Sequence, residues 1–444
     1  PPLLPPNPPS SPPPSPPTPR GSSDGTIASS TLLTSEAGGW PADRLPLTRF
    51  EQLGSAVTAI GDVDGDGVPD VAFSSLGPRT QFASGRVYVA LLSRTGGLKG
   101  LLGVYGAQLS LSRFDYFGSS LASPADLDGD LLPDGDLNFD GFPDLAAGAH
   151  GDDGEAGPRT GAVYLLFLAE GGIVMSSLKL SNHSTADVGL PLQPYGEFGR
   201  ALAVLNDAEG GETVTVAVGA PGEDDDAGAV YLLSLQLTND QGARNVQGAL
   251  LSFTRVAPPN VSPGERFGWA LAWVPDRDGD GHPELAIGAP GSPAEGRPGS
   301  VYLYNHRRRT FGDSILQPGQ RRSKAPLFGS SIALGADWDE NGERDLLVGA
   351  PGEPEGGSVY LIYQRPPGQA VFNELRHYRY TPTSLGLAAK DELVGQSVAA
   401  LGRIDGDLVP DVVIGTPPLG TFKEGGVVTV LLKATPPNAA PGDP

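Results

Sequence analysis

Short apolar runs, separated by polar and glycine-rich segments, return six times along this chain. Each return opens with an apolar residue followed by glycine. Next come a short apolar run, in most units an acidic loop, a strand ending in Gly-Ala-Pro or a relative of it, and a glycine-led run such as GAVYLL at 161–166. Because β-branched and aromatic residues bounded by Gly and Pro are typical of strands, the pattern predicts strands rather than helices. The opening residues are Leu53, Phe117, Phe198, Phe267, Phe328 and Val394.

The spacing of these openings predicts a ring of repeated units. The shortest interval, from 267 to 328, is 61 residues, and the longest, from 117 to 198, is 81 residues. Repeats of this size built from short strands indicate a propeller. Each unit supplies three evident strands and enough chain for a fourth, outer strand, except that the sixth unit ends after the run 426–432. Segment 26–52 has the length to supply the missing strand.

We therefore expect an all-β fold, a six-bladed β-propeller of four-stranded blades that an N-terminal strand closes. Closure removes the exposed sheet edges that are a general liability of β proteins. The expected domains are a proline-rich arm at 1–25, the propeller at 26–435 and a Pro-rich tail at 436–444. Residues 1–19 contain 12 prolines, a composition that cannot pack a core and favours an extended polyproline II arm. A flexible linker or stalk is the alternative.

Composition narrows the classes of function. The chain has 52 acidic and 30 basic residues and a net charge of −22, which disfavours nucleic acid and anionic membranes as partners. It has no cysteine, which excludes thiol catalysis, thiolate zinc sites and disulfides. No apolar run approaches the roughly 20 residues of a membrane helix. The chain begins with proline and no signal-like segment, so we expect a processed or partial chain.

A nine-residue loop with side-chain oxygens at positions 1, 3, 5 and 9 gives the strongest functional signal. Glycine at or beside position 6 turns the backbone so that these side chains converge, and position 7 adds a backbone carbonyl. Hard oxygen ligands in this number fit Ca²⁺. The predicted ligands are Asp62, Asp64, Asp66, Val68 and Asp70 in unit one; Asp276, Asp278, Asp280, His282 and Glu284 in unit four; and Asp337, Asp339, Asn341, Glu343 and Asp345 in unit five. An EF-hand is excluded, because its twelfth position is Phe73 in unit one.

Units two and six carry variants of this loop. Unit two has two in tandem, first Asp126, Asp128, Asp130, Leu132 and Asp134, then Asp136, Asn138, Asp140, Phe142 and Asp144. The second is favoured, because it directly precedes a strand at 145–149. Unit six has Asp405, Asp407, Val409 and Asp411, but Arg403 stands at position 1, where a cation is expected to weaken or abolish the site. Unit three has lost the spacing. We expect about four to six Ca²⁺ ions.

Phe-Gly, the acidic loop, Gly-Ala-Pro and Gly-x-Val-Tyr recur in this order over roughly 26–433. They resemble the FG-GAP repeats of the integrin α-subunit β-propeller. The resemblance implies Ca²⁺ in loops between the first two strands of several blades, and extracellular contacts with proteins or glycans. The chain departs from that family in having six units rather than seven, no cysteines, and no leg or inserted ligand-binding domain. Integrin ligand specificity therefore does not transfer.

Candidate glycosylation sites fall into two groups. The arm is similar to the Ser-Pro-rich segments of hydroxyproline-rich cell-wall glycoproteins of plants and green algae, which implies hydroxylated prolines and O-glycans near Ser10, Ser11, Ser15 and Thr18. Asn182 and Asn260 begin Asn-x-Ser sequences, which are acceptors for N-glycans in secreted proteins.

A basic cluster stands out against the acidic chain. It comprises Arg307, Arg308, Arg309, Arg321, Arg322 and Lys324. A solvated hairpin is one interpretation; a patch for acidic glycans or for the acidic face of another copy is the other.

The combined pattern predicts an extracellular, calcium-binding adhesion or structural module that contacts proteins or glycans, with no enzymatic activity. The five histidines form no spaced metal cluster, and no nucleophile elbow or phosphate loop is present. The arm of one copy docking on the next would build a filament. A glycan-binding lectin is the alternative, and a polysaccharide-degrading propeller enzyme is a further one.

Overall fold

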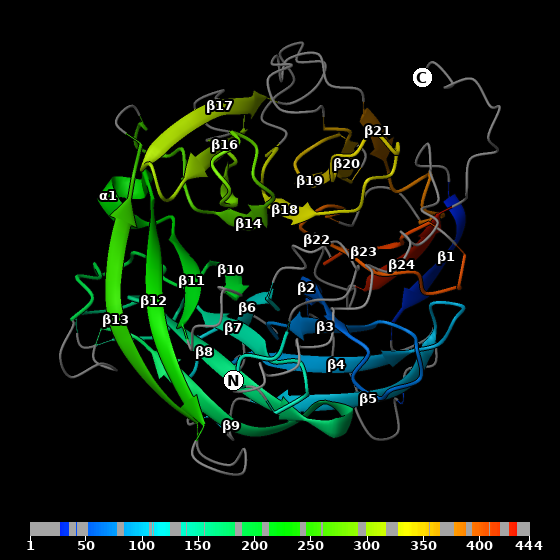
Figure 1. The fold of residues 1–444 in the computed structure, drawn as a ribbon, viewed down its shortest axis with the longest axis horizontal. Coiled ribbons are helices and arrows are strands. Elements are labelled where there is room, and N and C mark those ends of the chain that lie inside the picture. Colours follow the sequence, from blue (N-terminus) through cyan, green and yellow to red (C-terminus); the bar gives the residue numbers. More distant parts are fainter. Residues whose placement is uncertain are drawn as a thin grey trace, which may run out of the picture.

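A ring of four-stranded antiparallel sheets forms the protein in the computed structural model (Figure 1). The structure describes residues 27–34, 41, 52–77, 84–105, 109, 111–124, 135–138, 140–154, 156–182, 189–206, 213–239, 246–258, 261–291, 299–316, 327–354, 356–364, 377–387, 393–407, 409–417 and 426–432. Within these residues there are six sheets, so the predicted six-bladed propeller is confirmed. The segments expected to form the arm (1–25) and the tail (436–444) lie outside the described residues.

Five blades are built from consecutive strands, and each blade is named by its place in the sequence. Blade one contains β2 (Leu53–Gly61), β3 (Asp70–Ser75), β4 (Arg86–Leu92) and β5 (Leu98–Tyr105). Blade two contains β6 (Phe117–Ala122), β7 (Leu145–Ala149), β8 (Ala162–Ala169) and β9 (Ile173–Leu180). Blade three contains β10 (Ala201–Asn206), β11 (Thr213–Ala220), β12 (Ala229–Asn239) and β13 (Val246–Val256), with a short helix α1 (Glu223–Asp226) before β12.

The remaining blades repeat this order. Blade four contains β14 (Ala270–Val274), β15 (Glu284–Ala289), β16 (Ser300–Asn305) and β17 (Thr310–Leu316). Blade five contains β18 (Ser331–Leu334), β19 (Leu346–Ala350), β20 (Ser358–Ile362) and β21 (His377–Tyr380). Blade six contains β22 (Ser397–Ala400), β23 (Val412–Gly415) and β24 (Val427–Leu432). In each blade the first of these strands lies nearest the centre of the ring (Figure 1).

The outer strand of blade six comes from the other end of the chain. Strand β1 (Ile27–Leu33) pairs antiparallel with β24, from Ile27 opposite Leu432 to Leu33 opposite Val427. The blue β1 therefore lies beside the red β24 in Figure 1. This arrangement confirms the prediction that an N-terminal strand closes the ring.

Close contact between neighbouring blades explains why two glycines recur in five of the six units; unit one has Ser74 in place of the Gly of Gly-Ala-Pro. The Gly of Gly-Ala-Pro faces the carbonyl oxygen of the Gly that follows the next opening residue. A Cβ on Gly219 would collide with the carbonyl oxygen of Gly268, and a Cβ on Gly349 would collide with that of Gly395. Ring closure uses the same contact, between Gly415 and Gly54. The motif glycines thus set how closely the blades pack.

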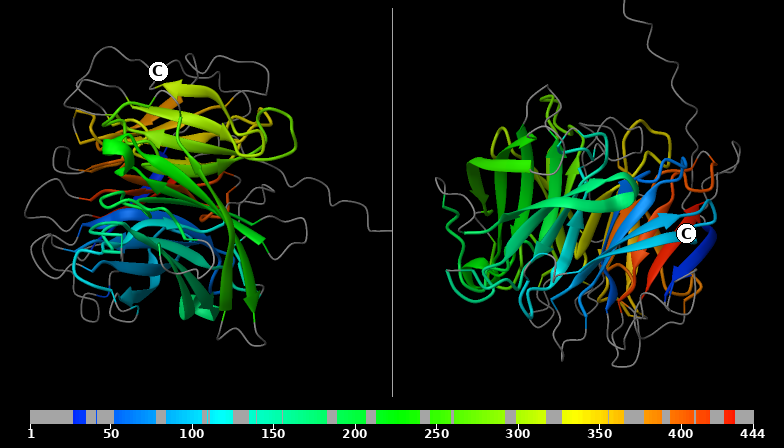
Figure 2. Two further views of the ribbon diagram at one scale, coloured as in Figure 1. Left: turned by 90° about the vertical axis from the view of Figure 1, so that its left-hand side faces the viewer. Right: turned by 90° about the horizontal axis from the view of Figure 1, so that it is seen from below.

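The hydrophobic core lies between adjacent sheets. The opening Phe is fully buried and meets the Tyr of the Gly-x-Val-Tyr run of its own blade: the Phe117 and Tyr164 ring centroids are 5.6 Å apart and perpendicular, and those of Phe328 and Tyr360 are 5.7 Å apart. Edge-to-face aromatic pairs of this kind add to the stabilisation that burial provides. In side view, the strands run between two opposite faces of the ring, where the connections lie (Figure 2). We call the face with the loops from first to second strands the acidic face.

Candidate metal centres

Five of the acidic loops lie within the described residues, except for positions 139 and 408, each between the first and second strand of a blade. They belong to blades one, two, four, five and six, and they all lie on the acidic face. The loop of blade two that is described is the second of the tandem pair. Asp126, Asp128, Asp130, Leu132 and Asp134 of the first lie outside the described residues.

The loop backbone wraps around the carboxylate at position 1. Asp276 accepts hydrogen bonds from the N–H groups of Gly279 at 2.7 Å and Gly281 at 2.6 Å. Asp62 is bound in the same way by Gly65 and Gly67, both at 2.7 Å. The side chain at position 5 accepts the N–H of position 7, as Asp280 does from His282 at 3.0 Å. These bonds shape each loop so that its side chains point inward.

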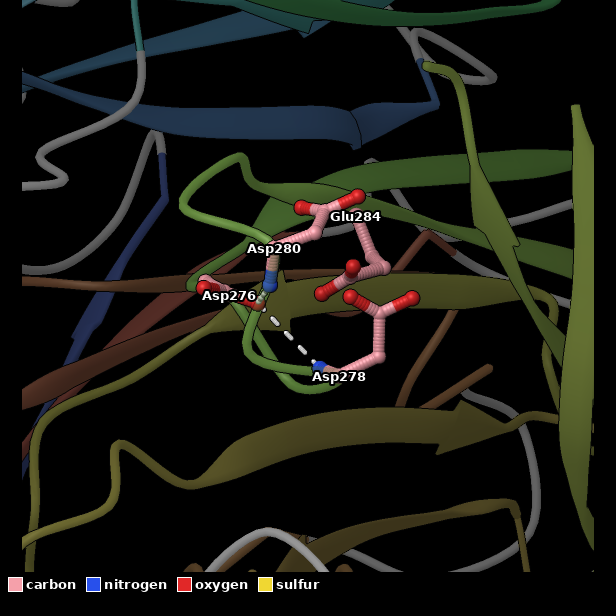
Figure 3. Close-up of side chains that lie close together, drawn as sticks. All are labelled: Asp276, Asp278, Asp280 and Glu284. Carbon is pink, nitrogen blue, oxygen red and sulfur yellow. Dashed lines mark hydrogen bonds between the residues drawn. The ribbon is translucent and has the colours of Figure 1, made fainter. Parts of the chain in front are cut away.

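The predicted side-chain ligands converge in three of these loops. In blade four, one oxygen from each of Asp276, Asp278, Asp280 and Glu284 lies within 4.8 Å of the others. Figure 3 shows these four side chains gathered at one loop. The same holds for Asp62, Asp64 and Asp70 in blade one, and for Asp337, Asp339 and Asp345 in blade five. Like charges this close repel strongly unless protons or cations compensate them.

The carboxylate at position 9 joins the loop to the third strand of its blade. Asp70 accepts the N–H of Val63, at position 2, at 3.0 Å and the N–H of Leu92, at the end of β4, at 2.9 Å. Asp144, Asp345 and Asp411 each accept two backbone N–H groups in the same way. In blade four, Glu284 is one carbon longer, and the side-chain amide of Asn305 replaces the second backbone donor at 3.2 Å.

Burial changes the acidity of these position-9 carboxyls. It raises the pKa of Asp70 to about 7, of Asp144 to about 8, of Glu284 to about 7, of Asp345 to about 8 and of Asp411 to about 7. The backbone hydrogen bonds offset part of each rise, and the neighbouring loop carboxylates add to it. Low-dielectric surroundings disfavour a charged carboxylate, and a bound cation would restore it.

Two side chains that the sequence analysis did not single out as loop partners reach into these loops. Lys99, on the outer strand β5, places its Nζ 2.6 Å from Asp64 Oδ2 and 2.7 Å from Asp66 Oδ2. Arg308, in the turn between β16 and β17, lies 2.9 Å from Asp278 and 3.3 Å from Asp280. Lys99 lies at the start of the fourth strand and Arg308 in the turn that leads into it, at the end of the blade that reaches the same face as the loop.

A third such side chain, Asn305, bridges the loop of blade four. Its amide nitrogen donates to Asp278 at 2.9 Å, to Asp280 at 2.8 Å and to Glu284. The signal for it was weak: Asn305 ends a strand directly opposite Glu284, but only the register reveals that pairing.

Blade two holds its loop as blades one and four do, with Asp136 accepting the N–H of Gly141 at 2.7 Å and Asp140 that of Phe142 at 3.0 Å, whereas blade six differs. In blade two, the amide of Asn138 donates to Asp140 at 3.1 Å. In blade six, Asp405 accepts the N–H of Asp407 at 2.9 Å, and Arg403 occupies position 1. Metal binding in these two loops stays a prediction. The same holds for ligation by the position-7 carbonyls, which belong to Val68, Phe142, His282, Glu343 and Val409.

The other predicted sites are partly described. Arg307, Arg308 and Arg309 are exposed in the β16–β17 turn, whereas Arg321, Arg322 and Lys324 lie outside the described residues. Asn182 follows β9 and is partly exposed, and Asn260 lies outside the described residues, as do Ser10, Ser11, Ser15 and Thr18. The glycosylation sites and the partner patch stay predictions.

Three segments of the chain match the FG-GAP repeat family, at residues 135–166, 267–304 and 328–362. Each of them contains one acidic loop and the two strands that follow it. FG-GAP repeats therefore lie in blades two, four and five of the propeller. None of the helices in the described part of the chain is long and apolar enough to cross a membrane.

Two curated proteins and one solved structure illustrate what this propeller resembles. Phosphatidylinositol-glycan-specific phospholipase D of Rattus norvegicus is 31% identical over 222 residues, covering 49% of this chain and 23% of that protein. Integrin alpha-3 of Mus musculus is 32% identical over 216 residues, covering 46% of this chain and 18% of that protein. The chain thus spans less than a quarter of either relative. The Dos1 propeller structure has 14% identity and a TM-score of 0.36 over 84% of this chain and 76% of that one.

Proposed function

We propose that this propeller is an extracellular, calcium-binding adhesion or structural module. The observation that carries the proposal is the convergence of carboxylates in the loops of blades one, four and five. Asp64 Oδ1 adds to it, because this buried oxygen has no hydrogen-bond partner among the described residues. A buried oxygen of this kind is costly without a partner, and a metal ion would supply one.

The donor set fits calcium better than other common metals. Its ligands are carboxylate, amide and carbonyl oxygens, which suit Ca²⁺, and the chain lacks the cysteines that softer metals prefer. Asp62, Asp64, Asp66 and Asp70 would hold the ion of blade one. Their counterparts in blades four and five are Asp276, Asp278, Asp280 and Glu284, and Asp337, Asp339, Asn341 and Asp345.

Calcium in these loops would stiffen each blade. The position-9 carboxylate already connects the loop to the third strand, so an ion bound to the loop would couple the first three strands of a blade. In a chain without disulfides, these ions would take the part that cross-links play in other extracellular proteins.

The adhesion role rests on the FG-GAP repeats and on the likeness to integrin alpha chains. Proteins or glycans outside the cell are the proposed partners, and the proline-rich arm is the proposed contact between copies in a filament. A lectin is the alternative within this class. The likeness to a phospholipase D favours an enzyme as the second candidate, although the match spans only 23% of that protein.

Elemental analysis and calorimetry test the proposal. Purified protein dialysed against calcium should retain several Ca²⁺ ions per chain, and it should melt at a lower temperature in chelator. A melting temperature that chelator leaves unchanged, with no calcium retained, would refute calcium binding. Assays for phospholipase and polysaccharide cleavage separate the enzyme from the binding module, because turnover is expected only of the enzyme.

A further inference from the structure

A second candidate site lies on the face opposite the acidic loops. There a cavity of about 610 Å³ opens between the connections of blades one, two, three and six. The residues that matter for its chemistry are Arg113, Arg159, Arg200, Phe114, Tyr116 and His150, all of which line the cavity. This volume is in the range of small-ligand pockets, which run from about 300 to 1,000 Å³.

Positive charge gathers in this cavity although the chain as a whole carries −22. Three arginines line it against one acid, Asp153. Arg159 forms an ion pair with Glu197, so its charge is compensated within the protein. The cavity therefore presents a net positive charge on a strongly acidic molecule, which favours an anionic ligand.

Arg200 is the cation best placed to bind such a ligand. Its guanidinium lies 4.1 Å from the centroid of the Trp269 ring, and the described residues include no carboxylate in an ion pair with it. Desolvation lowers the pKa of Arg200, yet an arginine stays charged in proteins. The charge of Glu197 offsets part of this desolvation, and the positive charges of Arg159 and Arg266 add to it. A bound carboxylate would compensate the remaining positive charge with two parallel hydrogen bonds.

Aromatic rings form another part of the cavity lining. The Tyr116 and His150 rings stack with centroids 5.1 Å apart and planes inclined by 9°. Phe114 is 41% exposed, so its ring is accessible to a ligand. Phe114 and Tyr116 have φ angles of 69° and 54°, and the corresponding Tyr195 and Glu197 of blade three have 61° and 58°, so this turn belongs to the repeat and presents the rings at the cavity. Burial keeps the pKa of His150 well below its usual value, so its ring is a neutral surface.

We propose that this cavity binds a carboxylated sugar, the uronic acid unit of an acidic glycan. Arg200 and Arg113 would bind its carboxylate, the aromatic rings would pack against the apolar face of the sugar ring, and polar side chains such as Gln52 and Gln396 would bind its hydroxyls. A concave site of this size suits the end of a short oligosaccharide better than a folded protein surface. The inference deepens the proposed adhesion role, and it is independent of the calcium loops, which lie on the opposite face.

Calorimetric titration with matched sugars tests this site. The probes are a trimer of galacturonic acid and a trimer of galactose of the same linkage, which differ only in the carboxylate. We expect the acidic trimer to bind at least tenfold more tightly than the neutral one, and its affinity to fall as salt rises from 50 to 500 mM. Equal binding of the two trimers, or no binding of either, would overturn the proposal.

Two arginines on the same indole provide the matched variants. Arg200 lines the cavity, whereas Arg266 lies 5.2 Å from the Trp269 ring centroid and does not line it. Arg200→Gln should weaken the acidic trimer at least tenfold, and Arg266→Gln should leave its affinity unchanged. An unchanged affinity in Arg200→Gln, or an equal loss in both variants, would contradict the assignment.

Further measurements keep the test decisive if Arg200→Gln fails to fold. Phe114→Ala removes an exposed ring and should weaken the acidic trimer about fivefold with the melting temperature preserved; no loss would overturn the proposal. A short aspartate-containing peptide is titrated in parallel. If the peptide binds and the uronate does not, the cavity binds a protein partner and the glycan proposal is wrong. Calcium content is measured on the same samples: loss of calcium binding with uronate binding intact would refute only the calcium loops.

Discussion

The ammonium group of Lys99 lies 2.6 Å from Asp64 and 2.7 Å from Asp66, in the middle of the predicted calcium loop of blade one. The cation comes from the outer strand, and the carboxylates come from the loop between the two innermost strands. In blade four, Arg308 approaches Asp278 and Asp280 from the turn that leads into the outer strand. These side chains neutralise part of the charge that calcium would neutralise, so the ion and the tethered cation compete.

Removing the competing cation should strengthen calcium binding in blade one. The Lys99 side chain is 45% exposed, so water screens the pair and we expect Lys99→Gln to raise the affinity only about two- to fivefold. Calcium titration by calorimetry measures the change. Lys179→Gln is the control, because Lys179 pairs with Asp152, outside the acidic loops, at 2.7 Å. A weaker affinity in Lys99→Gln would show that the lysine supports the site.

The effect of calcium on stability should grow with pH. Burial raises the pKa of Asp345 from 3.8 to about 8, so the folded metal-free protein holds a proton that the unfolded chain releases above pH 4. That contribution to stability is present below about pH 4 and is lost as the pH rises towards 8. A bound cation favours the ionised carboxylate. The rise in melting temperature on adding calcium should therefore be larger at pH 8 than at pH 6.

Scanning calorimetry at the two pH values, with calcium and with chelator, checks this dependence. Asp345→Asn cannot ionise, so the difference between the two pH values should shrink in this variant. An equal calcium effect at pH 6 and pH 8 in the unmodified protein would contradict the expectation.

The close contact between neighbouring blades should not tolerate a side chain at the motif glycines. A Cβ on Gly349 would overlap the carbonyl oxygen of Gly395 and the hydroxyl of Ser331. Overpacking typically costs about 1–3 kcal/mol, and here the clash is with backbone, so we expect Gly349→Ala to lose about 3 kcal/mol. Denaturant unfolding measures the loss. Gly189→Ala is the control, because no atom lies within 4 Å of its added Cβ, and it should stay within about 0.5 kcal/mol.

The proline-rich arm should be required for any assembly of copies. Residues 1–19 carry 12 prolines and few groups that could pack a core, so their proposed role is to contact another molecule. We expect deletion of residues 1–20 to abolish filaments seen by electron microscopy while the melting temperature stays unchanged. Filaments that persist after the deletion would exclude the arm as the contact.

The sequence predicts the blades well because a glycine follows the opening residue of every unit and has a local role there. The six opening residues predict six blades. The last unit lacks a fourth strand, which indicates that the N-terminal segment containing β1 supplies it. The ligand loops are equally local: four acids within nine residues are brought together by their own backbone turn, as in Asp276 to Glu284.

Features that depend on pairing between distant segments could not be predicted. Lys99 and Arg308 reach the loops only because the third and fourth strands bring them to the acidic face. The position-9 hydrogen bonds depend on the register of the third strand, as between Asp70 and Leu92. The cavity around Arg200 joins residues from blades one, two, three and six, which become neighbours only when the ring closes.

Closure of the ring by β1 also gives the molecule a mechanical property. The two ends of the ring are held by six paired positions between β1 and β24, without a covalent bond. Tension on the chain ahead of Ile27 is borne first by this pairing, before any other blade is loaded. A pull on the arm that exceeds the strength of the β1–β24 pairing would therefore detach β1 and open the ring at blade six. The other five sheets would keep all their strands.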